Sequence, residues 1–264
     1  MANVPAAEAR PAVIVTGVSR RGGIAAAVVR KLAASGWDVV LTGWPAYDET
    51  LSWGGDTGVA EELLSEVTAA GARAAYAPAD LSKVDAIADL FDQAEEALGS
   101  ITALVVVHNY ESESSGGLLQ VTPAEFDRSM AVNPRATLFL MAEFARRFSG
   151  PKGRGRVVTF TSGLPLKGTI AYAASKGAIE WITVSGAAEL AGYGITANAV
   201  NPGPNDTGWM SEESLAWHAE QTPLGRTGKP DDTAELVAFL CSEQSGWITG
   251  QILTSDGGWS TLRV

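Results

Sequence analysis

Strand-like apolar segments alternate along this chain with helical patterns, and this alternation restricts the fold more than any other feature of the sequence. The first segment is continuously apolar from residue 12 to residue 15, as expected for a parallel strand that is covered on both faces. The strand-like segments are 12–16, 38–42, 73–77, 103–107, 156–160, 196–200 and 248–254, and the helical segments are 24–34, 57–70, 84–98, 124–148, 171–191 and 231–241. This order predicts an α/β fold, a doubly wound parallel sheet of about seven strands with helices on both faces.

The first strand-like segment leads into a glycine-rich turn and then into an alanine-rich helical segment. Gly17, Gly22 and Gly23 lack a Cβ, so the backbone can take positive φ values and let a pyrophosphate approach closely. The free N–H groups that open the helix near Ile24 would point at such an anion. The turn therefore predicts a dinucleotide site, with an ordinary strand-to-helix turn as the alternative.

The composition indicates one globular domain. The chain has 264 residues, of which 46% are hydrophobic, and no linker-like run or fixed-period repeat divides it, so we expect a single domain over 1–264. The sole cysteine, Cys241, excludes a disulfide framework and a cysteine-rich metal site. No apolar stretch reaches the length of a signal peptide or membrane span, and the net charge is −11. We expect a soluble cytoplasmic protein with no membrane or nucleic-acid partner.

The stretch 204–223 fits neither a strand nor a core helix and follows the sixth strand-like segment. It would lie at the carboxyl edge of the sheet, where open α/β sheets bind ligands, and we interpret it as a substrate lid. Its bulky residues favour an apolar or aromatic carbonyl substrate, with packing of the lid against the domain as the alternative. These residues are Trp209, Met210, Trp217 and His218.

A series of short motifs follows in a characteristic order along the chain. They are the glycine turn from Thr16 to Ala25, Asp80-Leu81, Asn133, Ser162, Tyr172 with Lys176, the run from Asn198 to Gly203, and the run from Ser255 to Trp259. In order and spacing they resemble the short-chain dehydrogenase/reductase family, and within it the bacterial 3-oxoacyl-acyl-carrier-protein reductases. The resemblance implies a Rossmann-type domain with a nicotinamide cofactor. It also implies a homotetramer, or a dimer, formed through the long helices and the C-terminal segment.

By this resemblance, Asn133, Ser162, Tyr172 and Lys176 occupy the family's catalytic positions. Tyr172 and Lys176 are four residues apart in a predicted helix, so they share one face. A free tyrosine has a pKa of about 10, which a nearby ammonium lowers by stabilising the phenolate. Tyr172 would donate a proton to a carbonyl oxygen that Ser162 holds, as hydride reaches the carbon. The resemblance adds that Lys176 binds the nicotinamide ribose and that Asn133 helps to hold a water that leads protons to Lys176.

The cofactor preference depends on the residues that follow the second strand-like segment. An acidic residue there would bind the adenosine ribose of NAD, but the chain reads Thr42-Gly-Trp-Pro45. Arg20 and Arg21 lie in the glycine turn, where a guanidinium can bind a 2′-phosphate. The sequence predicts NADP(H), whereas Asp48 would favour NAD(H) if it folds back. The predicted cofactor-binding residues are Gly17, Ser19, Arg20, Arg21, Gly23, Ile24, Asp80, Leu81, Tyr172, Lys176, Pro202, Gly203 and Thr207.

Three features depart from the family pattern. The glycine turn is longer than usual, so Gly17, Gly23 and Ala25 take the three glycine places. The run Val106-Val-His-Asn109 replaces the family's Asn-Asn-Ala-Gly, beside the cofactor. The interval from Ser162 to Tyr172 is short, which leaves Thr161 as the alternative catalytic hydroxyl. Asp80 and Leu81 also have a plain alternative, a helix N-cap followed by a core leucine.

Together these features predict an NADP(H)-dependent oxidoreductase that interconverts a ketone and a secondary alcohol. The substrate would be a 3-oxoacyl thioester or a bulky or aromatic ketone. The alternatives are a nucleotide-binding isomerase or dehydratase, and a regulatory module without turnover. The altered run 106–109 permits both alternatives, and the retained Tyr172 and Lys176 disfavour the regulatory module.

Overall fold

A computed structural model of the chain describes residues 10–50, 54–111, 116–162, 168–208 and 210–263. Its centre is a seven-stranded sheet with the order β3-β2-β1-β4-β5-β6-β7, and every neighbouring pair is parallel. The strands are β1 (Ala12–Thr16), β2 (Asp38–Thr42), β3 (Ala74–Tyr76), β4 (Ile101–Val106), β5 (Gly155–Phe160), β6 (Ile195–Asn201) and β7 (Ile252–Thr254). The strand order reverses between β1 and β4, which confirms the predicted doubly wound fold.

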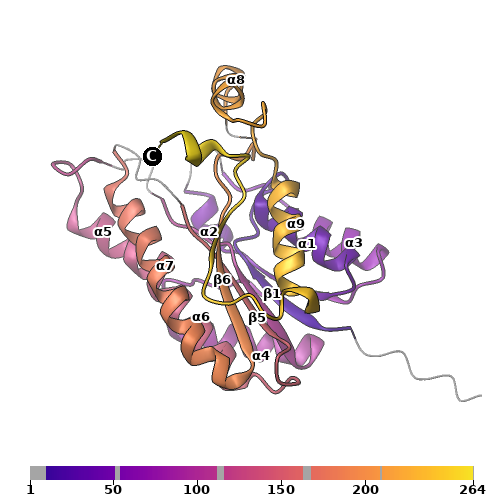
Figure 1. Ribbon diagram of the computed structural model, residues 1–264. Coiled ribbons are helices and arrows are strands. Elements are labelled where there is room, and N and C mark those ends of the chain that lie inside the picture. Colours follow the sequence, from indigo (N-terminus) through magenta and orange to yellow (C-terminus); the bar gives the residue numbers. More distant parts are fainter. Residues whose placement is uncertain (1–9, 51–53, 112–115, 163–167, 209, 264) are drawn as a thin grey trace, which may run out of the picture.

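Helices cover both faces of the sheet (Figure 1). One core cluster lies between the sheet and α1, α3 and α9, and a second lies under α4, α6 and α7. The helices are α1 (Ile24–Ala34), α2 (Pro45–Asp48), α3 (Val59–Ala69), α4 (Asp85–Leu98), α5 (Pro123–Met130), α6 (Ala136–Arg147), α7 (Ile170–Leu190), α8 (Glu212–Gln221) and α9 (Pro230–Cys241). Short turns are the π-helical η1 (Ala131–Arg135) and the 3-10 turns η2 (Ala191–Tyr193), η3 (Glu243–Ser245) and η4 (Trp259–Arg263). No helix in the described part of the chain is long and apolar enough to cross a membrane.

The single helix predicted over 124–148 is wrong, because the structure divides this region into α5, η1 and α6. Pro134 lies inside η1 and has no N–H to continue the α-helical hydrogen bonds, so the helix widens into a π turn there. The last strand is also shorter than predicted and covers only Ile252–Thr254. Two short helices, α2 and α8, were not predicted, and neither has a fully buried residue.

The turn after β1 brings the ends of β1 and β4 into contact. Gly17 has a φ of 81°, and a Cβ at this position would lie 2.6 Å from the Cα of His108, which follows β4. The turn closes where the N–H of Gly23 donates to the carbonyl of Arg20, at 3.1 Å. Helix α1 then begins at Ile24 with no acidic side chain in its first turn. Its N-terminus therefore keeps the positive field that favours an anion.

Gly17→Ala should lower the free energy of unfolding by at least about 2 kcal/mol, because alanine is strained at positive φ and its Cβ would collide with backbone. Urea unfolding measures this loss. Gly22→Ala in the same turn is the control, since a Cβ there meets nothing closer than 3.7 Å. It should change the free energy of unfolding by less than about 1 kcal/mol, and equal losses in the two variants would contradict the steric argument.

Candidate active site

A cavity of about 250 Å³ opens at the carboxyl edge of the sheet, beside the glycine turn. Its lining comes from the segments that follow β1 to β4: Gly17, Ser19, Thr42, Gly43, Trp44, Tyr47, Asp48, Ala79, Leu81, Ser82, Val107, His108, Asn109, Tyr110 and Glu111, with Arg128 and Val132 from α5 and η1. This is the crevice at the reversal of strand order, where open α/β sheets bind ligands. Of the predicted cofactor-binding residues, Gly17, Ser19 and Leu81 lie in this lining.

Asp80 and Leu81 follow β3 and point to different surroundings. One carboxylate oxygen of Asp80 accepts hydrogen bonds from the backbone N–H and the hydroxyl of Ser82, at 3.1 Å and 2.6 Å. The other oxygen lies 3.5 Å from the ammonium of Lys83. Leu81 is buried and lines the cavity. Asp80 therefore stabilises the turn that places Leu81 in the cavity wall.

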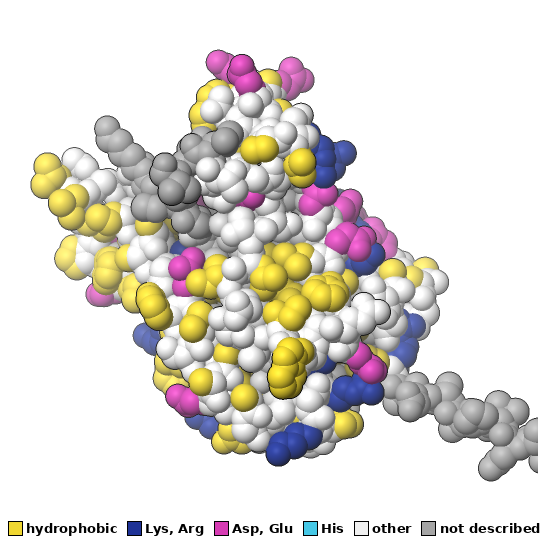
Figure 2. Space-filling model, viewed as in Figure 1, with side chains coloured by type: hydrophobic (Ala, Val, Ile, Leu, Met, Phe, Trp, Pro, Cys, Tyr) yellow, Lys and Arg dark blue, Asp and Glu magenta, His cyan; other side chains and the backbone are white. Residues whose placement is uncertain are grey.

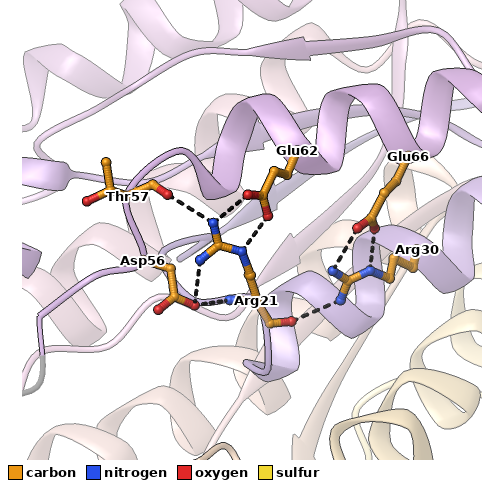
Figure 3. A network of polar contacts seen from close by, with 6 residues as sticks. All are labelled: Arg21, Arg30, Asp56, Thr57, Glu62 and Glu66. Carbon is orange, nitrogen blue, oxygen red and sulfur yellow. Dashed lines mark hydrogen bonds and ion pairs between the residues drawn. The ribbon is translucent and has the colours of Figure 1, made fainter.

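Arg21 lies in a network of acidic side chains rather than facing the cavity (Figure 3). Its guanidinium pairs with Glu62 of α3, donates to the carbonyl of Thr57 at 3.0 Å and lies 3.7 Å from Asp56. Its backbone N–H donates to the same Asp56 carboxylate at 2.6 Å. A 2′-phosphate at Arg21 would have to compete with these acceptors.

Arg20 has a different environment from its neighbour. It forms no ion pair with any residue in the described ranges, and one of its terminal nitrogens would lie 3.7 Å from a Cβ at Gly208. Thr207 also faces the glycine turn, because its carbonyl oxygen would lie 3.7 Å from a Cβ at Gly22. The glycine turn with Arg20 and the segment of Thr207 and Gly208 therefore lie next to each other.

Asp48, at the end of α2, folds back to the glycine turn. Its carboxyl group forms a hydrogen bond with the side chain of Ser19, and both residues line the cavity. Burial raises the pKa of this carboxyl to about 6, although the Ser19 bond acts in the opposite direction. A carboxylate here suits the hydroxyls of a ribose and repels a 2′-phosphate, so its effect opposes that of Arg20.

Tyr172, Lys176 and Ser162 meet at the start of α7. Lys176 is buried, its Nζ donates to the carbonyl of Phe160 at 3.2 Å, and it lies 5.7 Å from the ring centre of Tyr172. The side chain of Ser162 forms a hydrogen bond with Tyr172. The hydroxyl of Thr161 instead donates to Glu180, at 2.8 Å. The geometry thus brings Ser162, and not Thr161, to the tyrosine.

The electrostatics differ from the sequence-based expectation of a lowered tyrosine pKa. Burial raises the pKa of Tyr172 to about 12, the negative charge of Glu111 raises it further, and the Ser162 bond lowers it. Burial also lowers the pKa of Lys176 to about 8, against the opposing effect of Glu111. The difference arises because desolvation of the phenolate is the largest effect on Tyr172. At neutral pH Tyr172 therefore carries the proton that an acid catalyst needs.

Asn133 is fully buried in η1 and uses its amide to join three segments. Its Oδ1 accepts the N–H of Tyr110 at 2.7 Å, and its Nδ2 donates to the carbonyl of Tyr110 at 2.9 Å and to Ser175 Oγ at 2.8 Å. Ser175 in turn donates to the carbonyl of Tyr172 at 2.7 Å. Asn133 thus holds the loop after β4 against α7, which carries Tyr172 and Lys176.

His108, in the run that departs from the family pattern, is buried between β1 and η1. Its Nδ1 lies 2.9 Å from Thr16 Oγ1, and its Nε2 lies 2.8 Å from the carbonyl oxygen of Val132. Burial lowers the pKa of the imidazole to about 4, and the charge of Lys176 acts in the same direction. The ring is therefore neutral at physiological pH and forms part of the wall of the site.

Glu111 is a site residue that the sequence analysis missed. It is half-buried, lines the cavity and acts electrostatically on both Tyr172 and Lys176. The hydroxyl of Tyr47 donates to its backbone carbonyl at 3.3 Å, and the ring of Tyr47 lies 5.5 Å from that of Tyr110. No local motif marks these residues, since they meet only because segments that follow β2 and β4 both pass over the end of β1.

The predicted lid contains α8, which stands beyond the upper end of the sheet in Figure 1. Trp217 and His218 have ring centres 4.8 Å apart, and His218 lies 6.3 Å from Trp259 near the C-terminus. The contact of His218 with Trp259 agrees with the alternative, packing of the lid against the domain, whereas Trp217 is exposed. Met210 is half-buried, and Trp209 lies outside the described residues.

Pro202 and Gly203, at the base of the lid, are held by the segments around them. The carbonyl of Pro202 accepts the side-chain amide of Asn205 at 2.6 Å, and the N–H of Gly203 donates to Asn201 at 3.1 Å. A Cβ at Gly203 would lie 2.3 Å from the Cβ of Asp256. The C-terminal segment therefore supports the start of the lid.

His108→Gln should reduce the acid sensitivity of folding. An imidazole has a pKa of 6.5 in the unfolded chain and about 4 in the folded protein, so between these values the unfolded state binds more protons. The free energy of unfolding therefore falls as the pH falls through this window, by about 3 kcal/mol in total from this group. Urea unfolding of both proteins at pH 7 and at about pH 4.5 measures the loss. An equal loss in the variant, which shares every carboxylate, would contradict the assignment.

Comparison with known proteins gives the site its context. A family model described as enoyl-(acyl carrier protein) reductase matches residues 17–260. The uncharacterized oxidoreductase YjdA of Bacillus subtilis is 38% identical over 250 residues, which cover 93% of this chain and 95% of that protein. A blue fluorescent protein from a metagenomic library, solved in complex with NADPH, is 34% identical with a TM-score of 0.83, covering 95% of this chain and 98% of that one. A 3-oxoacyl-[acyl-carrier protein] reductase from Brucella melitensis is 27% identical with a TM-score of 0.82, covering 96% and 98%.

These matches extend over nearly the whole chain, and the solved structures share its fold. The chain is an oxidoreductase that belongs to the short-chain dehydrogenase/reductase family.

Proposed function

We propose that this protein interconverts a ketone and a secondary alcohol with a nicotinamide dinucleotide as hydride donor or acceptor. The grouping of Ser162, Tyr172 and Lys176 at the carboxyl edge of the sheet carries the proposal. Tyr172 is protonated at neutral pH and hydrogen-bonded to Ser162, so a proton donor and a second hydroxyl lie together where a carbonyl oxygen can bind. A regulatory module without turnover would not require this pair of hydroxyl groups, so the pair favours an enzyme.

The residues of the cavity fit a dinucleotide. Gly17 and Gly43 line it with bare backbone, which a ligand can approach closely, and a Cβ at either would collide with neighbouring backbone. Thr42 Oγ1 lines the cavity region, is buried, and finds no hydrogen-bond partner among the described residues. A buried hydroxyl without a partner costs free energy, and a ligand would supply the missing bond. The phosphates would lie at the start of α1, beside Ile24.

When bound, the nicotinamide supplies a hydride to the carbonyl carbon or accepts one from the alcohol carbon. The hydroxyl of Ser162 would hold the substrate oxygen, and this hydrogen bond strengthens as negative charge develops there. Tyr172 would donate its proton to that oxygen, and the charge of Lys176 would stabilise the phenolate that remains. Alcohol oxidation uses the same groups in reverse.

The substrate that we propose is a 3-oxoacyl thioester or a bulky or aromatic ketone. The likeness to a 3-oxoacyl-[acyl-carrier protein] reductase supports the first. The second has less support, because the ring of Trp217 lies against His218, and His218 in turn lies near Trp259. Loss of reduced-nicotinamide absorbance with acetoacetyl thioester, an aliphatic ketone and an aromatic ketone, each with NADPH and NADH, tests both. Cofactor binding without turnover of any of them would favour the non-redox alternatives.

We propose NADP(H) as the cofactor form, with Arg20 as the residue that binds the 2′-phosphate. The likeness to a structure solved with NADPH and the absence of a described acidic partner for Arg20 support this choice. NAD(H) is the second candidate, and the observation that favours it is the Asp48 carboxyl beside Ser19 in the cavity. Arg21 contributes little in either case, because Glu62 and Asp56 already compensate its charge.

A homotetramer is the assembly that we propose. Hydrophobic side chains gather on the face that holds α9 and β7 (Figure 2), where Phe239 and Ile252 are exposed. Trp247, between these elements, is 99% exposed, and Trp181 on α7 is 74% exposed. Exposed apolar side chains on this face and on α7 suit burial in subunit contacts. We also propose that the protein is cytoplasmic.

Tyr172→Phe should reduce turnover by a factor of about 100 to 10,000, because it removes the proton donor and leaves the ring in place. Cofactor affinity, measured by fluorescence titration, should stay within about threefold, since phenylalanine fills the same space. Tyr193→Phe is the control, because Tyr193 is exposed in η2, away from the cavity. Near-normal turnover by Tyr172→Phe would rule out the proposed acid.

Arg20→Ala should weaken NADPH binding by about tenfold or more, the effect of losing one charge-assisted hydrogen bond, and should change NADH binding much less. Arg21→Ala is the matched control from the same turn, and its losses should be similar for both cofactors. Calorimetric titration of each variant with each cofactor measures the four affinities. A selective NADPH loss in Arg21→Ala alone would transfer the role to Arg21, and no selective loss in either would favour NAD(H).

A further inference from the structure

The run Val106 to Asn109 places an imidazole between the two halves of the candidate site. Val106 ends β4 and Asn109 is exposed, whereas His108 is buried. On one side His108 contacts Thr16, the last residue of β1 before the glycine turn. On the other it contacts Val132, which adjoins Asn133 in η1. One side chain therefore touches both the end of β1, from which the glycine turn begins, and the turn that carries Asn133.

The hydrogen bonds around His108 select one form of its ring. Thr16 Oγ1 accepts the backbone N–H groups of Val107 and His108, at 3.0 Å and 3.2 Å. Both lone pairs of this hydroxyl are then used, so its hydrogen goes to His108 Nδ1 at 2.9 Å. The Nε2 must carry the ring hydrogen, which it donates to the Val132 carbonyl at 2.8 Å. These partners are satisfied only by the neutral Nε2–H tautomer.

The surroundings also disfavour a charged ring. A proton on Nδ1 would face the Thr16 hydroxyl, whose lone pairs already accept two hydrogen bonds. Lys176 is the charged group that acts on His108 among the described residues, and its positive charge repels an imidazolium. The ring is also buried among backbone groups, where an added charge is poorly solvated.

Val132 connects His108 to the residues around Tyr172, because it directly precedes Asn133 in η1. Asn133, the next residue, holds both backbone groups of Tyr110 and donates to Ser175. Ser175 donates to the carbonyl of Tyr172 and directly precedes Lys176. A shift of η1 relative to β1 would therefore move this whole set relative to the glycine turn.

We propose that His108, as the neutral Nε2–H tautomer, is a positioning residue that holds η1 at a set place relative to the glycine turn. It thereby aligns the hydroxyl of Tyr172 with the nicotinamide of a dinucleotide whose phosphates bind at that turn. The kinetic part of this proposal rests on the function proposed above. The tautomer and the contacts of the ring do not depend on which reaction the protein catalyses. The proposal for His108 and the proposed function can therefore fail separately.

The first test is the protonation state of the ring in the full-length protein. The chain contains two histidines, so His218→Asn leaves His108 as the only imidazole in a long-range proton–nitrogen NMR spectrum. We expect a protonated Nε2 and an unprotonated Nδ1, with shifts that stay constant from pH 8 to about pH 5.5. An Nδ1–H tautomer, or a titration midpoint near the ordinary value of 6.5, would overturn the proposal.

The second test separates positioning from stability. His108→Phe keeps the volume and loses both side-chain hydrogen bonds, whereas His108→Gln keeps a donor and an acceptor. We expect His108→Phe to lower kcat by at least about tenfold with KM changed by less than about threefold, as for a misplaced catalytic group. His108→Gln should restore most of the lost kcat.

Thr159→Val is the matched control for this test. It removes a buried hydrogen bond, from Thr159 in β5 to Thr183 in α7 at 2.7 Å, and it has no contact with the glycine turn. We expect it to lower the thermal midpoint while leaving kcat within about twofold. A normal kcat in folded His108→Phe, or an equal loss of kcat in Thr159→Val, would overturn the proposal. If His108→Phe does not fold, two results still test the proposal. An Nδ1–H tautomer in the NMR spectrum would overturn it, and His108→Gln should keep most of the kcat of the unaltered protein.

Discussion

The bare backbone of Gly17 lets the ends of β1 and β4 lie in contact, and the candidate site depends on this contact. A side chain there would collide with the Cα of His108. With the strands this close, the Thr16 hydroxyl can accept two N–H groups of the chain that follows β4. That chain then continues to Tyr110, whose backbone is held by Asn133. Through Asn133 the cavity wall at Tyr110 is thus joined to α7.

Burial determines the proton chemistry of the site as much as the identity of its residues does. Desolvation raises the pKa of Tyr172 to about 12 and lowers that of Lys176 to about 8. Both shifts have the same physical origin, since a low-dielectric surrounding disfavours the charged form of either group. Glu111 then acts on both groups in one direction, because its negative charge opposes the phenolate and favours the ammonium. Tyr172 therefore keeps its proton at neutral pH, and both burial and Glu111 disfavour its phenolate.

Charge at the adenosine end of the cavity follows from partners that lie far apart in the chain. Glu62 is 41 residues from Arg21 and yet takes up its guanidinium (Figure 3). Asp48 reaches Ser19 because α2 turns back after β2. Because Glu62 pairs with Arg21, Arg20 is the arginine of the turn that has no described acidic partner. The contact with Ser19 places the Asp48 carboxyl beside the same turn. The choice between the two cofactor forms is a balance of these two charges, which counting charged residues in the turn does not reveal.

The strands, most helices and the pairing of Tyr172 with Lys176 were predictable from the sequence, because they depend on local periodicity. Continuous apolar runs mark buried parallel strands, and residues four apart share a helical face whatever the rest of the chain does. The tertiary structure alone decided which of Thr161 and Ser162 meets Tyr172, how Arg21 is neutralised, that Glu111 belongs to the site, and which contacts the His108 ring makes. It also decided the sign of the Tyr172 shift. Each of these depends on groups that folding brings within a few ångströms and on the water that it removes, and no local pattern in a sequence encodes either.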